Sequence, residues 1–203
     1  MDKTPIITIT PVAYVDMILA VESCPVEVSG LGDIEHEGNE WKATSIVVIP
    51  QRCSAGGTKF DPLAHNLYIA RLLKEGRRAE ADLKKLWWHS HVLGPALFSM
   101  IDDHYINRVF GRNVPRSAQN PWLLSIVGNK YRQLGVRLDI FRPERLTYDR
   151  LPIHLSPNPG RDALRELYYA RRTQIGKTVR ELVTILPSHK ERKRNDTDEE
   201  EIR

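Results

Sequence analysis

The chain has 203 residues, of which 41% are hydrophobic and 28% are charged, a balance that suits one folded domain with a sizeable core plus an appendage. No run is long and apolar enough to span a membrane, and two cysteines, Cys24 and Cys53, are too few for a disulfide scaffold. We therefore expect an intracellular, cytoplasmic protein with buried thiols. The formal net charge of +4 permits a nucleic-acid partner, but no recognised nucleic-acid motif accompanies it.

The N-terminal part of the chain predicts a strand, a helix and a hairpin. Residues 6–10 alternate weakly between apolar and polar side chains, as a half-buried strand does. Pro11 suits the first turn of a helix that we expect to extend to about Ser23. Residues 26–35 and 41–49 then predict a pair of strands joined by a polar turn.

A loop and a long helical region are predicted next. Residues 51–58 contain two glycines and are predicted to form a loop. Leucine and alanine at near-helical spacing predict a helix that starts at Asp61 or Pro62 and breaks at Gly76. We expect this helix to cover one face of the sheet. The basic residues assigned to its solvated side are Arg77, Arg78, Lys84 and Lys85.

Two histidines follow a short apolar run that contains Trp87 and Trp88 and predicts a buried strand. Because side chains alternate along a strand, His89 and His91 point to one face and Ser90 points to the other. Two imidazoles on one face can chelate a single ion, and neutral imidazole is a favoured zinc ligand. A His-x-His pair alone is nevertheless more often incidental than a metal site.

A serine and an aspartate stand at a fixed distance beyond the histidines. Residues 92–98 contain Gly and Pro and are predicted to turn the chain, after which Ser99 opens a helix over residues 99–109. Asp102 lies on the same side of the first turn as Ser99, from where it could return to the histidines. Two His, one Asp and an open position are typical of a catalytic zinc. Ser-x-x-Asp is equally an ordinary helix cap, and the adjacent Asp103 competes with Asp102 as the ligand.

The next apolar runs predict further strands and the fold class. Residues 122–128, 137–142 and 146–148 are strand-like, with a turn after the first of them at Asn129 and Lys130. Strands and helices that alternate in this order predict an α/β sandwich, in which a curved mixed sheet has helices on both sides.

The composition changes near residue 156. Residues 156–160, Ser-Pro-Asn-Pro-Gly, mark a boundary, and residues 162–186 predict an arginine-rich helix. This helix could bind an acidic protein or nucleic acid, and no membrane contact is expected. The final residues are basic and then acidic, so we expect them to be disordered. The predicted units are a domain over residues 1–155, a C-terminal helix over residues 156–187 and a tail over residues 188–203.

The site residues resemble a known motif. His89-Ser90-His91, seven residues, Ser99, two residues and Asp102 are similar to the JAMM motif, H-S/T-H-x7-S-x2-D, of the MPN (Mov34/MPN/PAD-1) zinc metalloproteases. The resemblance covers roughly residues 5 to 150. Many family members have Pro directly after the second His, where this chain has Val92, which changes the loop and no ligand.

The family also carries a glutamate on an early strand, within a segment similar to E-v-x-G-l. Residues 27–31, Glu-Val-Ser-Gly-Leu, match that segment and favour Glu27 over Glu22 on the preceding helix. From its apolar neighbours alone, Glu27 is better explained as an outward-facing edge position.

The resemblance implies a small prokaryotic- or viral-type member with the MPN (JAB/cytidine-deaminase-like) fold and one Zn²⁺ held by His89, His91 and Asp102. The implied activity is deubiquitinase-like: hydrolysis of the amide or isopeptide bond after the C-terminus of ubiquitin or a ubiquitin-like protein. Zinc would lower the pKa of a water molecule from ~16 towards ~7. Glu27 would accept its proton, and Ser99 would donate a hydrogen bond to the oxyanion.

Two other functions stay open. The first is a catalytically silent MPN scaffold, although all five motif positions are present in this chain. The second is a nucleic-acid-associated protein of the same fold, with the arginine-rich helix as its anchor.

Overall fold

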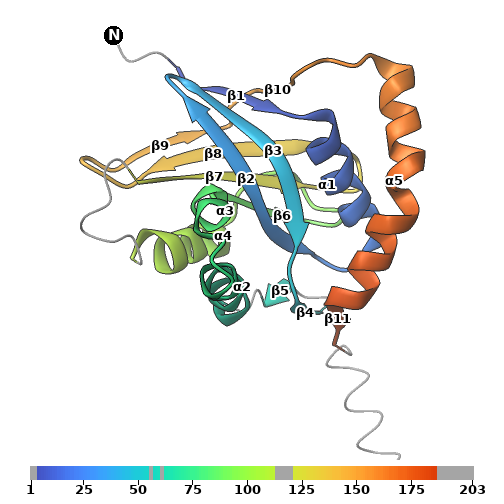
Figure 1. Ribbon diagram of the computed structural model, residues 1–203, viewed down its shortest axis with the longest axis horizontal. Helices are drawn as coiled ribbons and strands as arrows, with labels where there is room; N and C mark the ends of the chain where they lie inside the picture. Colours follow the sequence, from blue (N-terminus) through green and yellow to red (C-terminus); the bar gives the residue numbers. More distant parts are fainter. Residues whose placement is uncertain (1–3, 55–56, 60–61, 113–120, 187–203) are drawn as a thin grey trace, which may run out of the picture.

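The computed structural model describes residues 4–54, 57–59, 62–112 and 121–186. Its centre is a twisted, eight-stranded mixed sheet (Figure 1). In spatial order, the strands are β10 (Ile153–Leu155), β1 (Ile6–Ile9), β3 (Glu40–Val48), β2 (Ser29–Glu37), β6 (Leu86–Ser90), β7 (Trp122–Gly128), β8 (Leu134–Ile140) and β9 (Leu146–Asp149).

Strand β6 lies in the middle of this sheet. It pairs antiparallel with β2 on one side and parallel with β7 on the other, and all five of its residues are buried. Because side chains alternate along a strand, Trp87 and Trp88 enter two different apolar clusters on opposite faces of the sheet. The strand that carries His89 is therefore held by backbone pairing on both edges and by tryptophan packing on both faces.

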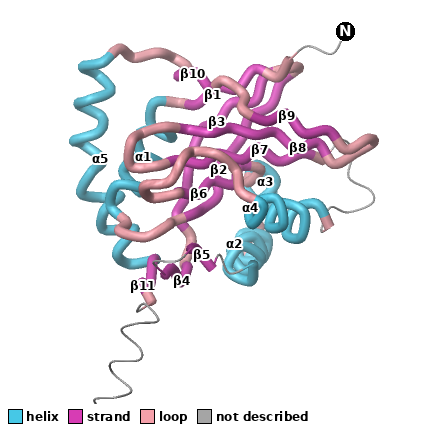
Figure 2. Tube along the Cα trace, turned by 180° about the vertical axis from the view of Figure 1, so that it is seen from behind, coloured by secondary structure: helices cyan, strands magenta, loops and turns pink. Residues whose placement is uncertain are grey.

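Helices cover both faces of the sheet (Figure 1, Figure 2). On one face lie α1 (Pro11–Ser23) and α5 (Arg161–Leu182). On the other face lie α2 (Pro62–Lys74), α3 (Arg78–Leu83) and α4 (Met100–Tyr105), and α4 continues as the π-helical segment η1 (Ile106–Gly111). The predicted α/β class, a curved mixed sheet between helical layers, is confirmed.

The larger core forms where α1 packs between the sheet and α5. Thr10 caps α1 through its hydroxyl, and Pro11 occupies the first turn as predicted. The carboxylate of Asp16, which is buried in α1, pairs with Arg171 of α5 at 2.7 Å between Oδ2 and Nη2. The buried apolar residues that α5 adds to this core are Ile175 and Val179.

A second, three-stranded sheet corrects two predictions. Its strands are β11 (Val183–Ile185), β4 (Gln51–Ser54) and β5 (Gly57–Lys59). The loop predicted over residues 51–58 is wrong, because β4 pairs antiparallel with β5 and parallel with β11. The helix predicted over residues 162–186 ends at Leu182, where the chain extends to pair with β4.

Other element boundaries differ from the predictions. The strand predicted over residues 137–142 is β8, which begins at Leu134 and ends at Ile140, and the short strand β10 was not predicted. The helix predicted over residues 99–109 changes to π-helical hydrogen bonding at Ile106. Lys84 does not lie on a solvated face: it is buried and its Nζ lies 2.6 Å from Oδ1 of Asp33 in β2. The predicted tail, residues 188–203, falls outside the described residues.

Both cysteines are free, buried thiols, as predicted. Burial raises the pKa of Cys53 to about 12, which keeps that thiol protonated and unreactive. Among the described helices, none has the length and apolar character needed to cross a bilayer.

His65 makes the stability of the fold sensitive to acid. This α2 side chain is 8% exposed and its ring centroid lies 5.0 Å from that of Phe110, and burial lowers its pKa to about 4. The unfolded chain takes up this proton below pH ~6.5, whereas the folded chain resists protonation until about pH 4. Stability from the neutral imidazole is therefore complete above pH ~6.5 and is lost progressively as the pH falls towards 4.

We expect the free energy of unfolding to drop by about 2 kcal/mol between pH 7.5 and pH 5 through His65 alone. Urea unfolding of a His65→Leu variant at both pH values should show a correspondingly smaller drop. His154→Leu, at an exposed position, serves as the control and should retain the wild-type drop. Equal pH dependence of wild type and His65→Leu would contradict this assignment.

Candidate metal centre

His89 is held in place mainly by aromatic rings. It is 4% exposed, and its imidazole stacks on Trp87 with ring centroids 4.4 Å apart and an interplanar angle of 15°. Phe98 contacts the imidazole edge-on at 5.9 Å. Its Nδ1 has no hydrogen-bond partner among the described residues, so ring packing is what orients Nε2.

His91 is oriented by the loop that follows it. Its Nδ1 lies 3.0 Å from the carbonyl of Pro95, which places the donor proton on Nδ1 and leaves the lone pair of the neutral ring on Nε2. The loop is strained at Val92, where a β-branched residue has φ of +29°. A hydrogen bond from the backbone N–H of Lys130 to the carbonyl of Val92, at 2.9 Å, helps to hold that conformation.

The loop after His91 packs closely on the neighbouring hairpin. The side-chain amide of Asn129 donates to the carbonyl of Gly94 at 2.9 Å. Gly135 in β8 permits the closest approach, because a Cβ there would lie 2.1 Å from the carbonyl oxygen of Ala96. The imidazole of His91 therefore depends on β7 and β8 as well as on its own strand.

Asp102 is both a helix cap and a neighbour of the two imidazoles. Ser99 is the N-cap of α4, and its backbone N–H and its hydroxyl both donate to Oδ2 of Asp102 at 2.7 Å. The other carboxylate oxygen, Oδ1, lies 3.1 Å from Nε2 of His89. The capping and metal-ligand explanations of Ser-x-x-Asp are thus compatible, because the carboxylate has two oxygens.

Three side chains meet at this point. Nε2 of His89 and Nε2 of His91 are 3.2 Å apart, and Asp102 lies 3.1 Å from the first through Oδ1 and 3.4 Å from the second through Oδ2. Ligands about 2.05 Å from the centre of a tetrahedron are about 3.3 Å apart. The separations and the donor types fit one divalent ion, and His89, His91 and Asp102 form a group that could hold it.

The electrostatics of the three residues agree with a site for positive charge. Burial works to raise the pKa of Asp102, but hydrogen bonds with His89, His91 and Ser99 lower it far below its usual range. The hydrogen bond with Asp102 raises the pKa of His91 although burial opposes this. A carboxylate and two imidazole lone pairs repel one another unless a proton or a metal ion lies between them.

Glu27 lies beside His91 but outside the three-residue group. Ser29 of β2 is opposite His89 of β6, and the backbone N–H of Ser90 donates to the carbonyl of Val28, so Glu27 lies just beyond the end of this pairing, near His91. Glu27 is half-buried, and its charge contributes to the raised pKa of His91. It was predicted near the start of a strand from residue 26, whereas β2 begins only at Ser29.

Two buried side chains hold the segment that carries Glu27. The hydroxyl of Ser90 accepts a hydrogen bond from the N–H of Val28 at 2.9 Å. The side-chain amide of Gln51 binds both backbone groups of Ser29, at 2.9 Å to N and 2.7 Å to O. Sequence reasoning did not identify Gln51, since nothing in its local pattern links it to Ser29.

A buried ion network anchors the helix that carries Asp102. Arg137 of β8 pairs with Asp139 through two hydrogen bonds, at 2.9 and 3.0 Å, and also donates to Asp103. Asp139 is completely buried. Asp103 therefore points away from the histidines towards β8, which favours Asp102 over Asp103 as the ligand. In the sequence, an arginine and an aspartate two residues apart on an otherwise apolar strand, Arg137 and Asp139, indicate a buried ion pair.

Comparisons with known proteins identify no family. No family model matches the chain, and no curated protein matches it. Among solved structures, the solution structure of protein DSY2949 from Desulfitobacterium hafniense is 18% identical, with a TM-score of 0.42, over 74% of this chain and 92% of that one. A likeness of this degree identifies neither a family nor an activity.

We expect Asp103→Ala to weaken the binding of an added divalent metal ion by on the order of ten-fold, because it releases α4 from Arg137 and loosens Asp102 without removing a candidate ligand. Competition with a chromophoric chelator measures this affinity. Asp82→Ala, at an exposed position on α3, is the matched control and should bind the metal ion as the wild type does. Unchanged affinity in Asp103→Ala would show that the network does not position the ligand.

Proposed function

We propose that this chain is a zinc-dependent metalloprotease of the JAMM type with an MPN fold. Its proposed reaction is hydrolysis of the amide or isopeptide bond after the C-terminus of ubiquitin or a ubiquitin-like protein. The observation that carries the proposal is the convergence of His89, His91 and Asp102 at 3.1 to 3.4 Å, with Glu27 close enough for its charge to raise the pKa of His91. A helix cap alone does not require two histidines to meet its carboxylate.

In this proposal, His89, His91 and Asp102 hold the zinc ion. When bound, zinc polarises a carbonyl and lowers the pKa of water to about 7. Glu27 accepts the proton of the attacking water and returns it to the leaving amine, so one carboxylate serves as general base and then as general acid. The half-buried position of Glu27 beside His91 suits this transfer.

Ser99 is proposed to stabilise the oxyanion. Its single hydroxyl proton is donated to Oδ2 of Asp102 in the described conformation. To act on an oxyanion, the hydroxyl must rotate away from Asp102. The backbone N–H of Ser99 continues to satisfy Oδ2 at 2.7 Å, so the rotation leaves the carboxylate in place.

The rim of the site favours a protein substrate. Four large apolar side chains around the loop and the start of α4 are exposed: Leu93 by 66%, Leu97 by 48%, Met100 by 87% and Ile101 by 80%. An apolar rim beside a polar centre is typical of a surface that binds another protein. A ubiquitin-like domain with an apolar surface patch would cover this rim while its C-terminal tail enters the site.

Metal identity is the first test, because two histidines and one carboxylate also suit non-haem iron. We expect about one zinc per chain by elemental analysis of the purified protein, and loss of that zinc in Asp102→Ala. Glu27→Gln should retain the zinc and reduce cleavage of a fluorogenic ubiquitin C-terminal amide by roughly 10²- to 10⁴-fold. Iron in place of zinc, or full activity of Glu27→Gln, would refute the proposed mechanism.

The rim predicts a separate effect on substrate binding. We expect Met100→Glu and Ile101→Glu to raise KM for the ubiquitin substrate by about ten-fold and to leave kcat and zinc content nearly unchanged, because both side chains are exposed and neither is a proposed ligand. Leu67→Glu, on an apolar position of α2 that is 58% exposed, is the control. A fall in kcat at constant KM would contradict a substrate-binding role.

A further inference from the structure

The outer side of α5 and the adjoining β7–β8 turn form a basic surface with two exposed tyrosines. We propose that this surface binds single-stranded nucleic acid. We call it the basic–tyrosine surface, and its residues are Lys130, Tyr131, Arg132, Arg165, Tyr169 and Arg172. The inference needs no metal and goes beyond the proposed protease function.

The helix α5 presents different residues to its two sides. Its buried side packs on α1 through residues such as Ile175 and Val179. Arg165, Tyr169 and Arg172 follow one another at i, i+4 and i+7, so they share a face, and all three are exposed. Tyr169 is 63% exposed, which leaves its ring open to stacking.

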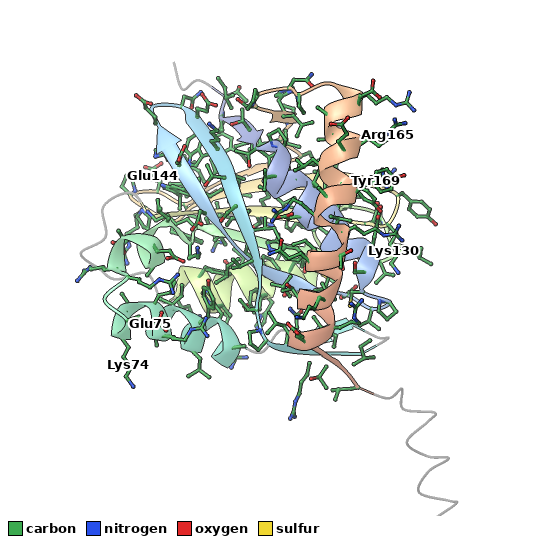
Figure 3. All side chains as sticks on the ribbon, turned by 45° about the vertical axis from the view of Figure 1, so that its right-hand side comes forward. Lys74, Glu75, Lys130, Glu144, Arg165 and Tyr169 are labelled. Carbon is green, nitrogen blue, oxygen red and sulfur yellow. The ribbon has the colours of Figure 1, made fainter. Side chains whose placement is uncertain are left out.

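The β7–β8 turn extends this face beyond the helix. The guanidinium of Arg132 lies 5.2 Å above the ring of Tyr168 in α5, and its Nε donates to Glu22 at 2.9 Å. The hydroxyl of Tyr168 donates to the same carboxylate at 2.5 Å. The β7–β8 turn and α5 are therefore in direct contact. Figure 3 shows Lys130, Arg165 and Tyr169 along one side of the molecule.

The surface carries more positive than negative charge, and most of its basic side chains are unpaired. Lys130, Arg165 and Arg172 make no ion pair with any residue in the part of the chain that the structure describes. The negative charge of Glu22 is already matched by Arg132 at 2.9 Å. Two exposed acidic residues, Asp162 and Glu166, lie on the same stretch of α5, so the four basic residues of the surface exceed its three carboxylates, Glu22 included, by one.

The exposed side chains favour nucleic acid over an acidic protein. Protein interfaces need a buried apolar centre, but the large exposed apolar residues here are the two tyrosines, with Tyr131 64% exposed. An aromatic ring between cations suits single strands, because bases stack on the ring while phosphates meet the cations. The exposed aliphatic residues Leu93, Leu97, Met100 and Ile101 belong to the rim of the metal centre instead.

The test is fluorescence polarisation of fluorescein-labelled 20-nucleotide dT and rU strands with the full chain, from 50 to 300 mM NaCl. We expect wild-type binding that weakens with salt. Arg165→Glu with Arg172→Glu should reduce affinity at least ten-fold and make the slope of log affinity against log salt shallower by about 1.4. Tyr169→Ala should lose about ten-fold, and Tyr169→Phe should recover it, since stacking needs only the ring.

The matched control is Lys74→Glu with Arg78→Glu, which changes the net charge equally at exposed positions near the α2–α3 junction; Figure 3 marks Lys74 far from Tyr169. It should bind the strands almost as the wild type does. Equal loss in this control would overturn the assignment to α5. Absence of binding to either strand at 50 mM NaCl would overturn the proposal itself and leave an acidic protein as the partner to test. Zinc content and protease activity of all these variants should be unchanged, so failure here is distinguishable from failure of the proposed function.

Discussion

The meeting of two imidazole nitrogens and a carboxylate at the end of β6 is the constraint on which the site depends. Nε2 of His89 and Nε2 of His91 are only 3.2 Å apart, and each also lies within 3.4 Å of Asp102. With Nδ1 of His91 donating to the carbonyl of Pro95, Nε2 of its neutral ring and the carboxylate of Asp102 are facing acceptors. A proton or a cation between these acceptors relieves their repulsion, and the surrounding structure holds the three side chains together.

That arrangement comes from buried groups that act on the backbone around the ligands. Ser90 projects away from the metal side of β6 and binds Val28, while Gln51 clamps Ser29, so the segment of Glu27 is fixed from two directions. Arg137 fixes α4 through Asp103. Ser90, the middle residue of His-Ser-His, thus fixes the backbone of the neighbouring segment, whereas the two histidines face the candidate metal site.

The local features of the site were predictable from sequence, whereas the long-range supports were not. Strand alternation predicts the shared face of His89 and His91, and capping chemistry predicts Ser99 at the start of a helix with Asp102 on its first turn. The choice between Asp102 and Asp103 was open locally, because the ion pair that draws Asp103 away comes from Arg137 in β8. Lys84 was misassigned for the same reason: its partner Asp33 lies on β2, far away in the sequence.

The missed strands have the same physical cause. β4 and β11 are short, and they pair with each other across more than a hundred residues, in the register in which Val183 faces Gln51. Hydrogen bonding to a distant segment outweighs local propensity in such short pieces. Periodicity could not indicate that the end of α5 would return to β4.

This pairing also joins the C-terminal helix to the candidate metal centre. α5 runs directly into β11, β11 pairs with β4 at Gln51, and the amide of Gln51 binds the backbone of Ser29 next to the Glu27 segment. Removing α5 and β11 would take away a partner strand of β4, the ion pair of Asp16 and part of the main core. Loss of the proposed activity in a truncated chain would then be explained by the loss of the hydrogen bonds between Gln51 and Ser29 as readily as by the loss of a binding surface. Point changes on the outward face of α5 separate the two effects, because Arg165, Tyr169 and Arg172 contribute nothing to the pairing of β11 with β4.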